Sequence, residues 1–293
     1  MAGRIALWLR TFGLMAFLGA LLIGIGYIIG GLIVATYMLV ISLMLNIFTY
    51  WFSDRVVLRM YGARIIEDSE LPWLHSMVED LAEKANIPKP RIAIVHTSTP
   101  NAFATGRNPK HSVVAVTDGL LSLLNREEIR GVLGHELTHI KNRDMLIGTI
   151  AAVLSTAIVY LAYAARWLLL FFVGGDERDG ESVLFLILMS IFAPIAALLV
   201  RMAISRSREF LADEGSALLT GNPEALARAL LKLERGVARY PMQSSAASTA
   251  HLFIVNPLRS SLLVSLFSTH PSTESRIENL RKIAEKMGVT FRV

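Results

Sequence analysis

The 293-residue chain is 53% hydrophobic and only 18% charged, a composition that a soluble domain could not bury and that indicates a membrane protein. It has no cysteine, which excludes disulfides, thiolate nucleophiles and cysteine-ligated metal sites. Basic residues flanking apolar spans explain the net charge of +5 better than a nucleic-acid partner does, because no nucleic-acid recognition motif is present.

The first apolar segment, residues 11–53, contains no Asp, Glu, Lys, Arg or His. A helix needs roughly 20 apolar residues to cross the hydrocarbon core, so this segment suits two crossings. The turn is expected at Gly30 and Gly31, because adjacent glycines weaken a helix and permit left-handed geometry. A cleaved signal peptide has a much shorter apolar region. Residues 1–53 are therefore predicted to form a transmembrane hairpin.

A helix and a small β-sheet are predicted next in the chain. Leu74, Val78 and Leu81 recur at helical spacing within residues 72–85. Asn125, followed by two glutamates, is typical of a helix start. This helix should run to about Arg143, where it could lead straight into the next apolar segment. Strands are expected over residues 91–95, 101–106 and 111–116, further helices near 202–219, 223–237 and 273–287, and a loop over 241–262.

Two more apolar segments, residues 145–175 and 183–200, enclose the short acidic loop 176–182. They are predicted to form a second transmembrane hairpin, although Arg166 and Pro194 interrupt them. Buried helices of a soluble domain are the alternative. Basic residues gather on the cytoplasmic side of membrane spans. Four spans with both termini in the cytoplasm would place on that side Arg4, Arg10, Arg55, Arg59, Arg64, Arg201, Arg206 and Arg208.

The sharpest chemical signal is the sequence His-Glu-Leu-Thr-His at residues 135–139. His135 and His139, at positions i and i+4, share one helix face, so both imidazoles can reach a single metal ion. Glu136 would lie beside the open position of a zinc ion, where it can take a proton from water. A surface helix with two solvated histidines is the alternative.

A third zinc ligand is expected, because a catalytic zinc normally has three protein ligands. The extended motif with a third histidine is missing, since Asn142 and Met145 occupy its positions. Glu209 and Asp213 share one helix face at i and i+4, so Glu209 could bind zinc while Asp213 accepts a hydrogen bond from a ligand imidazole. An exposed acidic helix that pairs with neighbouring arginines explains the same spacing equally well.

These motifs together resemble the HtpX family of membrane-bound zinc metalloproteases, which is related to the CaaX prenyl endopeptidases. The resemblance rests on the His-Glu-Leu-Thr-His motif between apolar hairpins and on Ser-Arg-Glu-Phe-Leu-Ala-Asp at residues 207–213. Residues 101–106 and 269–271 are similar to further family motifs in the same order. The resemblance covers the whole chain. It implies a zincin-like α+β protease domain, Glu209 as third zinc ligand, Asp213 supporting a ligand, and degradation of misfolded membrane proteins.

The resemblance also implies a substrate-binding edge that pairs with an extended peptide by strand addition, made of Asn101, Ala102, Phe103 and Ala104. Asn101 could equally be a turn residue. His270 could donate a hydrogen bond to the oxyanion of the reaction or simply begin a helix. Arg276, one helical turn later, could serve the oxyanion in the same way, but a solvated ion pair is expected. Asp144 lies just after the predicted helix that carries residues 135–139, the metal-motif helix, and is expected to have a structural role.

The sequence thus predicts a mainly α membrane protein with about four transmembrane helices and a small β-sheet. Hairpins at 1–53 and 145–200 would alternate with cytoplasmic catalytic parts at 54–144 and 201–293, in a multi-pass protein of the cell membrane. The predicted cofactor is one Zn²⁺ per chain. The predicted partners are protein or peptide substrates, with membrane proteins expected among them, and the lipid bilayer.

Two rival functions have distinct signatures. A prenylated-peptide (CaaX-type) endopeptidase would be expected to carry more membrane spans, enclosing a chamber. A non-enzymatic membrane scaffold with a structural zinc would be expected to have four protein ligands and no open position.

Overall fold

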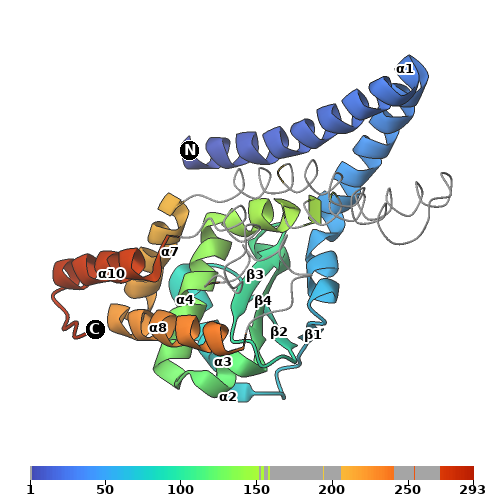
Figure 1. Ribbon diagram of the computed structural model, residues 1–293. Coiled ribbons are helices and arrows are strands. Elements are labelled where there is room, and N and C mark those ends of the chain that lie inside the picture. Colours follow the sequence, from blue (N-terminus) through green and yellow to red (C-terminus); the bar gives the residue numbers. More distant parts are fainter. Residues whose placement is uncertain are drawn as a thin grey trace, which may run out of the picture.

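The computed structural model describes residues 2–151, 206–240 and 271–293, together with the single positions 153, 154, 158, 194 and 254. Helices dominate this part of the chain, and they surround one small mixed β-sheet (Figure 1). The predicted combination of mainly α structure with a small sheet is confirmed.

The first helix, α1 (Ala2–Met60), bends sharply at Gly31. The φ of Gly31 is 63°, in the left-handed region that glycine adopts readily, so the turn lies where the two adjacent glycines predicted it. Close to the bend the two arms touch: a Cβ added to Gly26 would lie 3.1 Å from the Cα of Ala35. The bend therefore folds α1 back on itself, as Figure 1 shows.

The second arm of α1 contains a candidate membrane span, Gly31–Phe52. This stretch has 22 residues and a mean hydropathy of 2.2, so it is long and apolar enough to cross a bilayer. The apolar stretch in the first arm, Met15–Gly24, is shorter. Of the four predicted spans, the described part of the chain thus contains one clear candidate. The predicted spans at 145–175 and 183–200 lie largely outside the described residues.

The sheet has four strands in the order β1-β2-β4-β3. Strands β2 and β4 are parallel, and the other two pairs are antiparallel, which leaves β3 at one edge. Three strands lie where the sequence predicted them, whereas β1 is too short to give a sequence pattern. The strands are β1 (Arg64–Ile65), β2 (Arg91–Val95), β3 (Ala102–Gly106) and β4 (Ser112–Thr117).

Both faces of the sheet are covered, so the central residues of its inner strands, 92–95 of β2 and 113–116 of β4, are all apolar instead of alternating with polar residues. One face packs in the main core with α4 (Arg126–Asn142) and its neighbouring helices, which include α7 (Arg206–Thr220), α8 (Pro223–Arg239) and α10 (Thr273–Met287). The other face packs on the last turns of α1, where Phe103 and Val113 contact Val57 and Leu58. In Figure 1 the second arm of α1 runs beside the sheet, and α7, α8 and α10 gather on the other side of α4.

Six further helices agree with the predicted ones to within a few residues, except for α3, which was not predicted. They are α2 (Pro72–Ala85), α3 (Asp118–Leu123), α4 (Arg126–Asn142), α7 (Arg206–Thr220), α8 (Pro223–Arg239) and α10 (Thr273–Met287). The predicted start of α4 is confirmed: the side chain of Asn125 accepts a hydrogen bond from the N–H of Glu128, and the Glu128 carboxylate accepts one from the N–H of Asn125.

Helix α4 ends at Asn142, close to the predicted end, but it does not lead straight into the next apolar segment. Arg143 has a φ of 62°, so its left-handed conformation closes the helix, and helical structure resumes only at the next residue. The start of the following apolar segment is buried in the protein: Ile147 and Ile150 are almost fully enclosed. The hydroxyl groups of Thr149 and Thr105 lie 3.1 Å apart, which ties this segment to β3.

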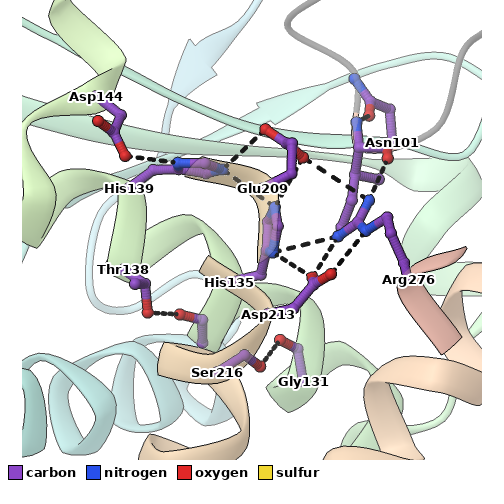
Figure 2. Close-up of polar contacts among 12 residues, drawn as sticks. Asn101, Gly131, His135, Thr138, His139, Asp144, Glu209, Asp213, Ser216 and Arg276 are labelled. Carbon is purple, nitrogen blue, oxygen red and sulfur yellow. Dashed lines mark hydrogen bonds and ion pairs between the residues drawn. The ribbon is translucent and has the colours of Figure 1, made fainter. Parts of the chain in front are cut away.

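Small residues allow α7 to approach α4 closely. A Cβ on Gly215 would overlap the side chain of Thr138, and the hydroxyl of Ser216 donates a hydrogen bond to the carbonyl of Gly131 at 2.6 Å (Figure 2). The Thr138 hydroxyl in turn donates to the Gly134 carbonyl of its own helix, at 2.8 Å. This close contact brings the first turn of α7 alongside the metal-motif helix.

Candidate active site

Three side chains converge from α4 and α7 (Figure 2). The Nε2 atoms of His135 and His139 are 3.1 Å apart, and oxygens of Glu209 lie 3.7 Å and 3.5 Å from them. Zinc bonds of about 2.0–2.2 Å in a tetrahedral site separate ligand atoms by about 3.3–3.6 Å. Two imidazole nitrogens this close repel each other unless a proton or a cation lies between them. The donor set and its spacing therefore fit one metal ion.

His135 is held by a carboxylate behind it. Its Nδ1 lies 2.9 Å from Oδ1 of Asp213, which is fully buried. When the ring proton of His135 is on Nδ1, that N–H donates a hydrogen bond to Asp213, and Nε2 keeps its lone pair for the metal. Asp213 lies one turn after Glu209 on α7, as the i, i+4 spacing predicted.

Arg276 differs from its prediction. It is not solvated: only 2% of it is exposed, and it donates two hydrogen bonds to the carboxylate of Asp213, from Nε at 2.9 Å and from Nη2 at 2.6 Å. The solvated pairing was wrong because the sequence gives no sign that α10 packs against α7. Arg276 outweighs the effect of burial on Asp213 and holds the pKa of that carboxyl below its usual range.

His139 has a looser partner. Its Nδ1 lies 3.4 Å from Oδ2 of Asp144, and the other oxygen of Asp144 lies 3.7 Å from Nη1 of Arg208. Asp144 comes directly after the left-handed residue that ends α4, so the break in the helix points its carboxylate back at the histidine. The structural role expected for Asp144 is therefore to support the imidazole of His139, which the sequence did not reveal.

Glu136 lies beside the cluster and is 5% exposed. Burial raises the pKa of Glu136 to about 7, although the positive charge on His139 opposes this shift and the backbone of Ala104 stabilises the carboxylate by a hydrogen bond. A carboxyl group with a pKa near neutrality can both accept and return a proton, which is what a general base and acid requires.

The pKa values of the two histidines are shifted in opposite directions. Burial, assisted by the charge on Arg276, lowers the pKa of His135 to about 4. Burial also disfavours the charged form of His139, but the hydrogen bond to Asp144 and the charges of Glu209 and Glu136 outweigh it and raise the pKa of His139 to about 9. At neutral pH without metal, His135 is therefore uncharged, whereas His139 carries a second ring proton and a positive charge.

The predicted substrate-binding residues lie at the edge strand. Asn101 is buried, its Oδ1 accepts a hydrogen bond from the N–H of Ile254 at 3.2 Å, and its Nδ2 has no partner in the described structure. Ala102 and Ala104 belong to the main core, whereas the Phe103 ring packs against Tyr61, with ring centres 5.1 Å apart. His270 lies outside the described residues.

The fold and the three converging ligands define a class of protein, the metallopeptidases. A family model described as peptidase family M48 matches residues 68–284, which is most of the chain. This chain belongs to peptidase family M48.

Similar proteins with known names are also peptidases. Two proteins called "Protease HtpX homolog", from Thermococcus kodakarensis and Pyrococcus furiosus, are each 58% identical to this chain, over 290 and 287 residues. Each alignment covers 98% of this chain and 99% of the relative. The solved structure of S. mikatae Ste24p matches at 18% identity with a TM-score of 0.44, over 96% of this chain and 64% of that one. The predicted family is confirmed, and membership favours an enzyme over a non-enzymatic scaffold.

The proton on His139 leads to a testable pH dependence. A metal binds the neutral imidazole, so uptake of zinc must displace this proton at any pH below about 9. Zinc affinity is expected to rise about tenfold per pH unit between pH 7 and 9 and then to level off. Chelator competition at several pH values measures this. Asp144→Asn, which removes the hydrogen bond that favours the charged imidazole, should move the plateau to lower pH. An affinity independent of pH would contradict the prediction.

Proposed function

We propose that this peptidase is a zinc-dependent endopeptidase of the cell membrane. In this proposal His135, His139 and Glu209 hold one Zn²⁺, and Asp213 fixes the tautomer of His135. The convergence of the three ligand atoms at 3.1–3.7 Å carries the proposal, because it matches the spacing around a tetrahedral zinc.

The proposed roles follow from the positions of the side chains. Zinc, when bound, would lower the pKa of its water and polarise the peptide carbonyl. Glu136 accepts the proton of the attacking water and then delivers it to the departing amine, so its pKa near 7 suits both steps. His270 remains a candidate donor to the oxyanion on the strength of the family resemblance alone.

The experiment that tests this proposal uses detergent-purified protein. Bound zinc and casein cleavage are quantified before and after removal of the metal by a chelator and after its return. Loss and recovery of cleavage with zinc would support the proposal, whereas full cleavage by metal-free protein would overturn it. Cleavage rates are also compared for the same peptide with and without a prenyl group. Faster cleavage of the prenylated form would reveal a CaaX-type preference.

We further propose that the substrate binds as an additional strand at β3. The Asn101 carbonyl accepts a hydrogen bond from the Thr117 N–H at 3.0 Å, so residue 101 faces β4. Antiparallel pairing alternates, and the backbone groups of Ala102 and Ala104 therefore face away from β4. The hydrogen bond between Ala104 and Glu136 agrees with this register and places the open edge next to the proposed base. This supports the inclusion of residues 101–104 in the substrate site.

Strand addition predicts an alternating response to backbone methylation of the substrate. A peptide series that carries one N-methyl group at successive positions should lose cleavage at every second residue, since alternate N–H groups would point at β3. We expect each sensitive position to raise KM by about 10-fold, the effect of roughly one lost hydrogen bond. Matched Cα-methylated peptides control for bulk. Uniform sensitivity along the peptide would argue against a strand.

The membrane placement rests on the span Gly31–Phe52 and on a contact between this span and the residue directly after β3. Arg107, directly after β3, lies over the ring of Trp51 at 4.7 Å, and Trp and Arg are favoured at membrane interfaces. Ala104 lies only two residues before the end of β3, about 7 Å along the strand. The proposed active site would then lie close to the bilayer surface, which supports membrane proteins as substrates and a role in their quality control.

Fusion proteins test this placement. A cleavable sequence placed at increasing distances from a membrane span should be cut when it lies near the span as well as far from it. Cleavage restricted to distant sites would contradict an active site at the bilayer surface.

The proposed topology puts two segments on the cytoplasmic face: residues 54–144, between the hairpins 1–53 and 145–200, and residues 201–293, after the second hairpin. Because the chain has no cysteine, single cysteines can be introduced and labelled without background. In intact cells, an impermeant reagent should label Ser182→Cys, in the predicted outer loop, and should not label Ser69→Cys. The reverse pattern would invert the topology.

A further inference from the structure

Arg276 is a buried arginine whose guanidinium makes contacts in two directions. On one side its Nε and Nη2 donate to both oxygens of Asp213, and Nη2 also lies 3.3 Å from Nδ1 of His135. On the other side its Nη1 donates to the backbone carbonyl of Ile254 at 2.9 Å. A buried charge is unfavourable unless it is paired and hydrogen-bonded, and Arg276 satisfies this condition entirely through groups next to the candidate active site.

The first direction leads to the metal ligands. Two parallel hydrogen bonds fix the plane of the Asp213 carboxylate as well as its position, which a single donor could not do. That carboxylate lies 2.9 Å from Nδ1 of His135, so its plane determines how the imidazole is turned. The corresponding support of His139 is weaker, because Asp144 is 3.4 Å away and its own arginine contact is 3.7 Å long.

The second direction leads to the substrate edge. The N–H of Ile254 donates to the side chain of Asn101 at 3.2 Å, and Asn101 directly precedes β3. Both backbone groups of Ile254 are thus fixed, one by Asn101 and one by Arg276. Figure 2 shows Arg276 with Asp213 and His135 on one side and Asn101 on the other.

We propose that Arg276 is a positioning residue that holds the two halves of the active site in register. It would orient His135 through Asp213, and it would place the start of the substrate edge through Ile254 and Asn101. This role goes beyond the proposed zinc peptidase but rests on it, since it concerns the same ligands and the same strand.

The test compares four variants: Arg276→Met, Asp213→Asn, the double variant, and Arg281→Met. Arg281 lies on the same helix but is exposed and pairs with Glu278, so it is the matched control. Zinc affinity is measured by chelator competition, and the ligand geometry by the visible absorption of the cobalt(II)-substituted protein. KM and kcat are measured at saturating zinc. Circular dichroism selects the variants that are folded.

We expect Arg276→Met and Asp213→Asn each to lower zinc affinity about 10- to 100-fold and to change the cobalt spectrum, as loss of such outer contacts does elsewhere. The double variant should bind zinc no more weakly than the weaker single variant, because Arg276 and Asp213 act together on the same nitrogen of His135. At saturating zinc only the variants that lack Arg276 should keep a raised KM, because the hydrogen bond to the Ile254 carbonyl comes from Arg276. Arg281→Met should match the wild type.

Two results would overturn this role. One is an Arg276→Met protein with the zinc affinity, cobalt spectrum and KM of the wild type. The other is additive losses in the double variant, which would mean that Arg276 does not orient His135 together with Asp213. If Arg276→Met does not fold, Arg276→Lys keeps the charge with a single donor group, and its zinc affinity should lie between those of the wild type and Asp213→Asn.

The wild-type control separates this role from the proposed function. A wild type that binds zinc and cleaves peptides supports the proposed function whatever Arg276 does. If the Arg276→Met variant then has the zinc affinity, cobalt spectrum and KM of the wild type, only the positioning role is overturned. A wild type that takes up no zinc would overturn both.

Discussion

Replacing Glu136 by Gln is expected to reduce peptide hydrolysis by about 10²- to 10⁴-fold, the usual contribution of a general base, while zinc remains bound. Glutamine has nearly the same shape and can still accept the hydrogen bond from Ala104, but it cannot take a proton from water. The three ligand atoms that converge at the candidate metal site belong to other residues, so zinc affinity should change little.

The measurement pairs bound zinc with peptide cleavage for the wild type and for two variants. Glu127→Gln is the matched control, because Glu127 is an exposed glutamate in the first turn of the same helix. It should behave as the wild type does. A Glu136→Gln protein that cleaved at the wild-type rate would show that the base is another group.

Replacing Glu209 by Ala is expected to lower zinc affinity by more than the roughly 10- to 100-fold typical of lost outer contacts, and activity should be lost with the metal. Two histidines alone would then remain at a site that normally needs three protein ligands. The change also removes one of the negative charges that favour the protonated form of His139, so metal-free Glu209→Ala should hold that proton less tightly.

Glu214→Ala is the control for this experiment, since Glu214 is exposed on the same helix. Zinc affinity is again measured by chelator competition, and thermal melting establishes that the fold is retained. If Glu209→Ala bound zinc as tightly as the wild type, the third ligand would have to be another residue, and the proposed site would be wrong in that respect.

Several features of this protein depend on interactions within a few residues, and these were predictable. The helix start at Asn125 is a local exchange of hydrogen bonds with Glu128. The bend in α1 follows from the conformational freedom of Gly31. His135 and His139 are one helical turn apart, so any helix through them places both imidazoles on one face.

Other features were missed because their local signals are short or ambiguous. Strand β1 has two residues and helix α3 has six, too few for hydrophobic periodicity to appear. The break at Arg143 was missed because arginine gives no sign of a left-handed conformation, which non-glycine residues rarely adopt. The carboxylate of Asp144 reaches His139 only as a result of that break.

The sequence alone thus determined the metal-motif helix, the first apolar hairpin and the family of this peptidase, because each is written in contiguous residues or short motifs. Only the tertiary structure decided that Glu209, 70 positions after His139, comes within 3.5 Å of it. The physical reason is the close approach of two helices, which needs a residue without a side chain at Gly215 opposite Thr138. The burial of Arg276 against Asp213 likewise depends on how α10 packs against α7, and spacing along the chain carries no information about that contact.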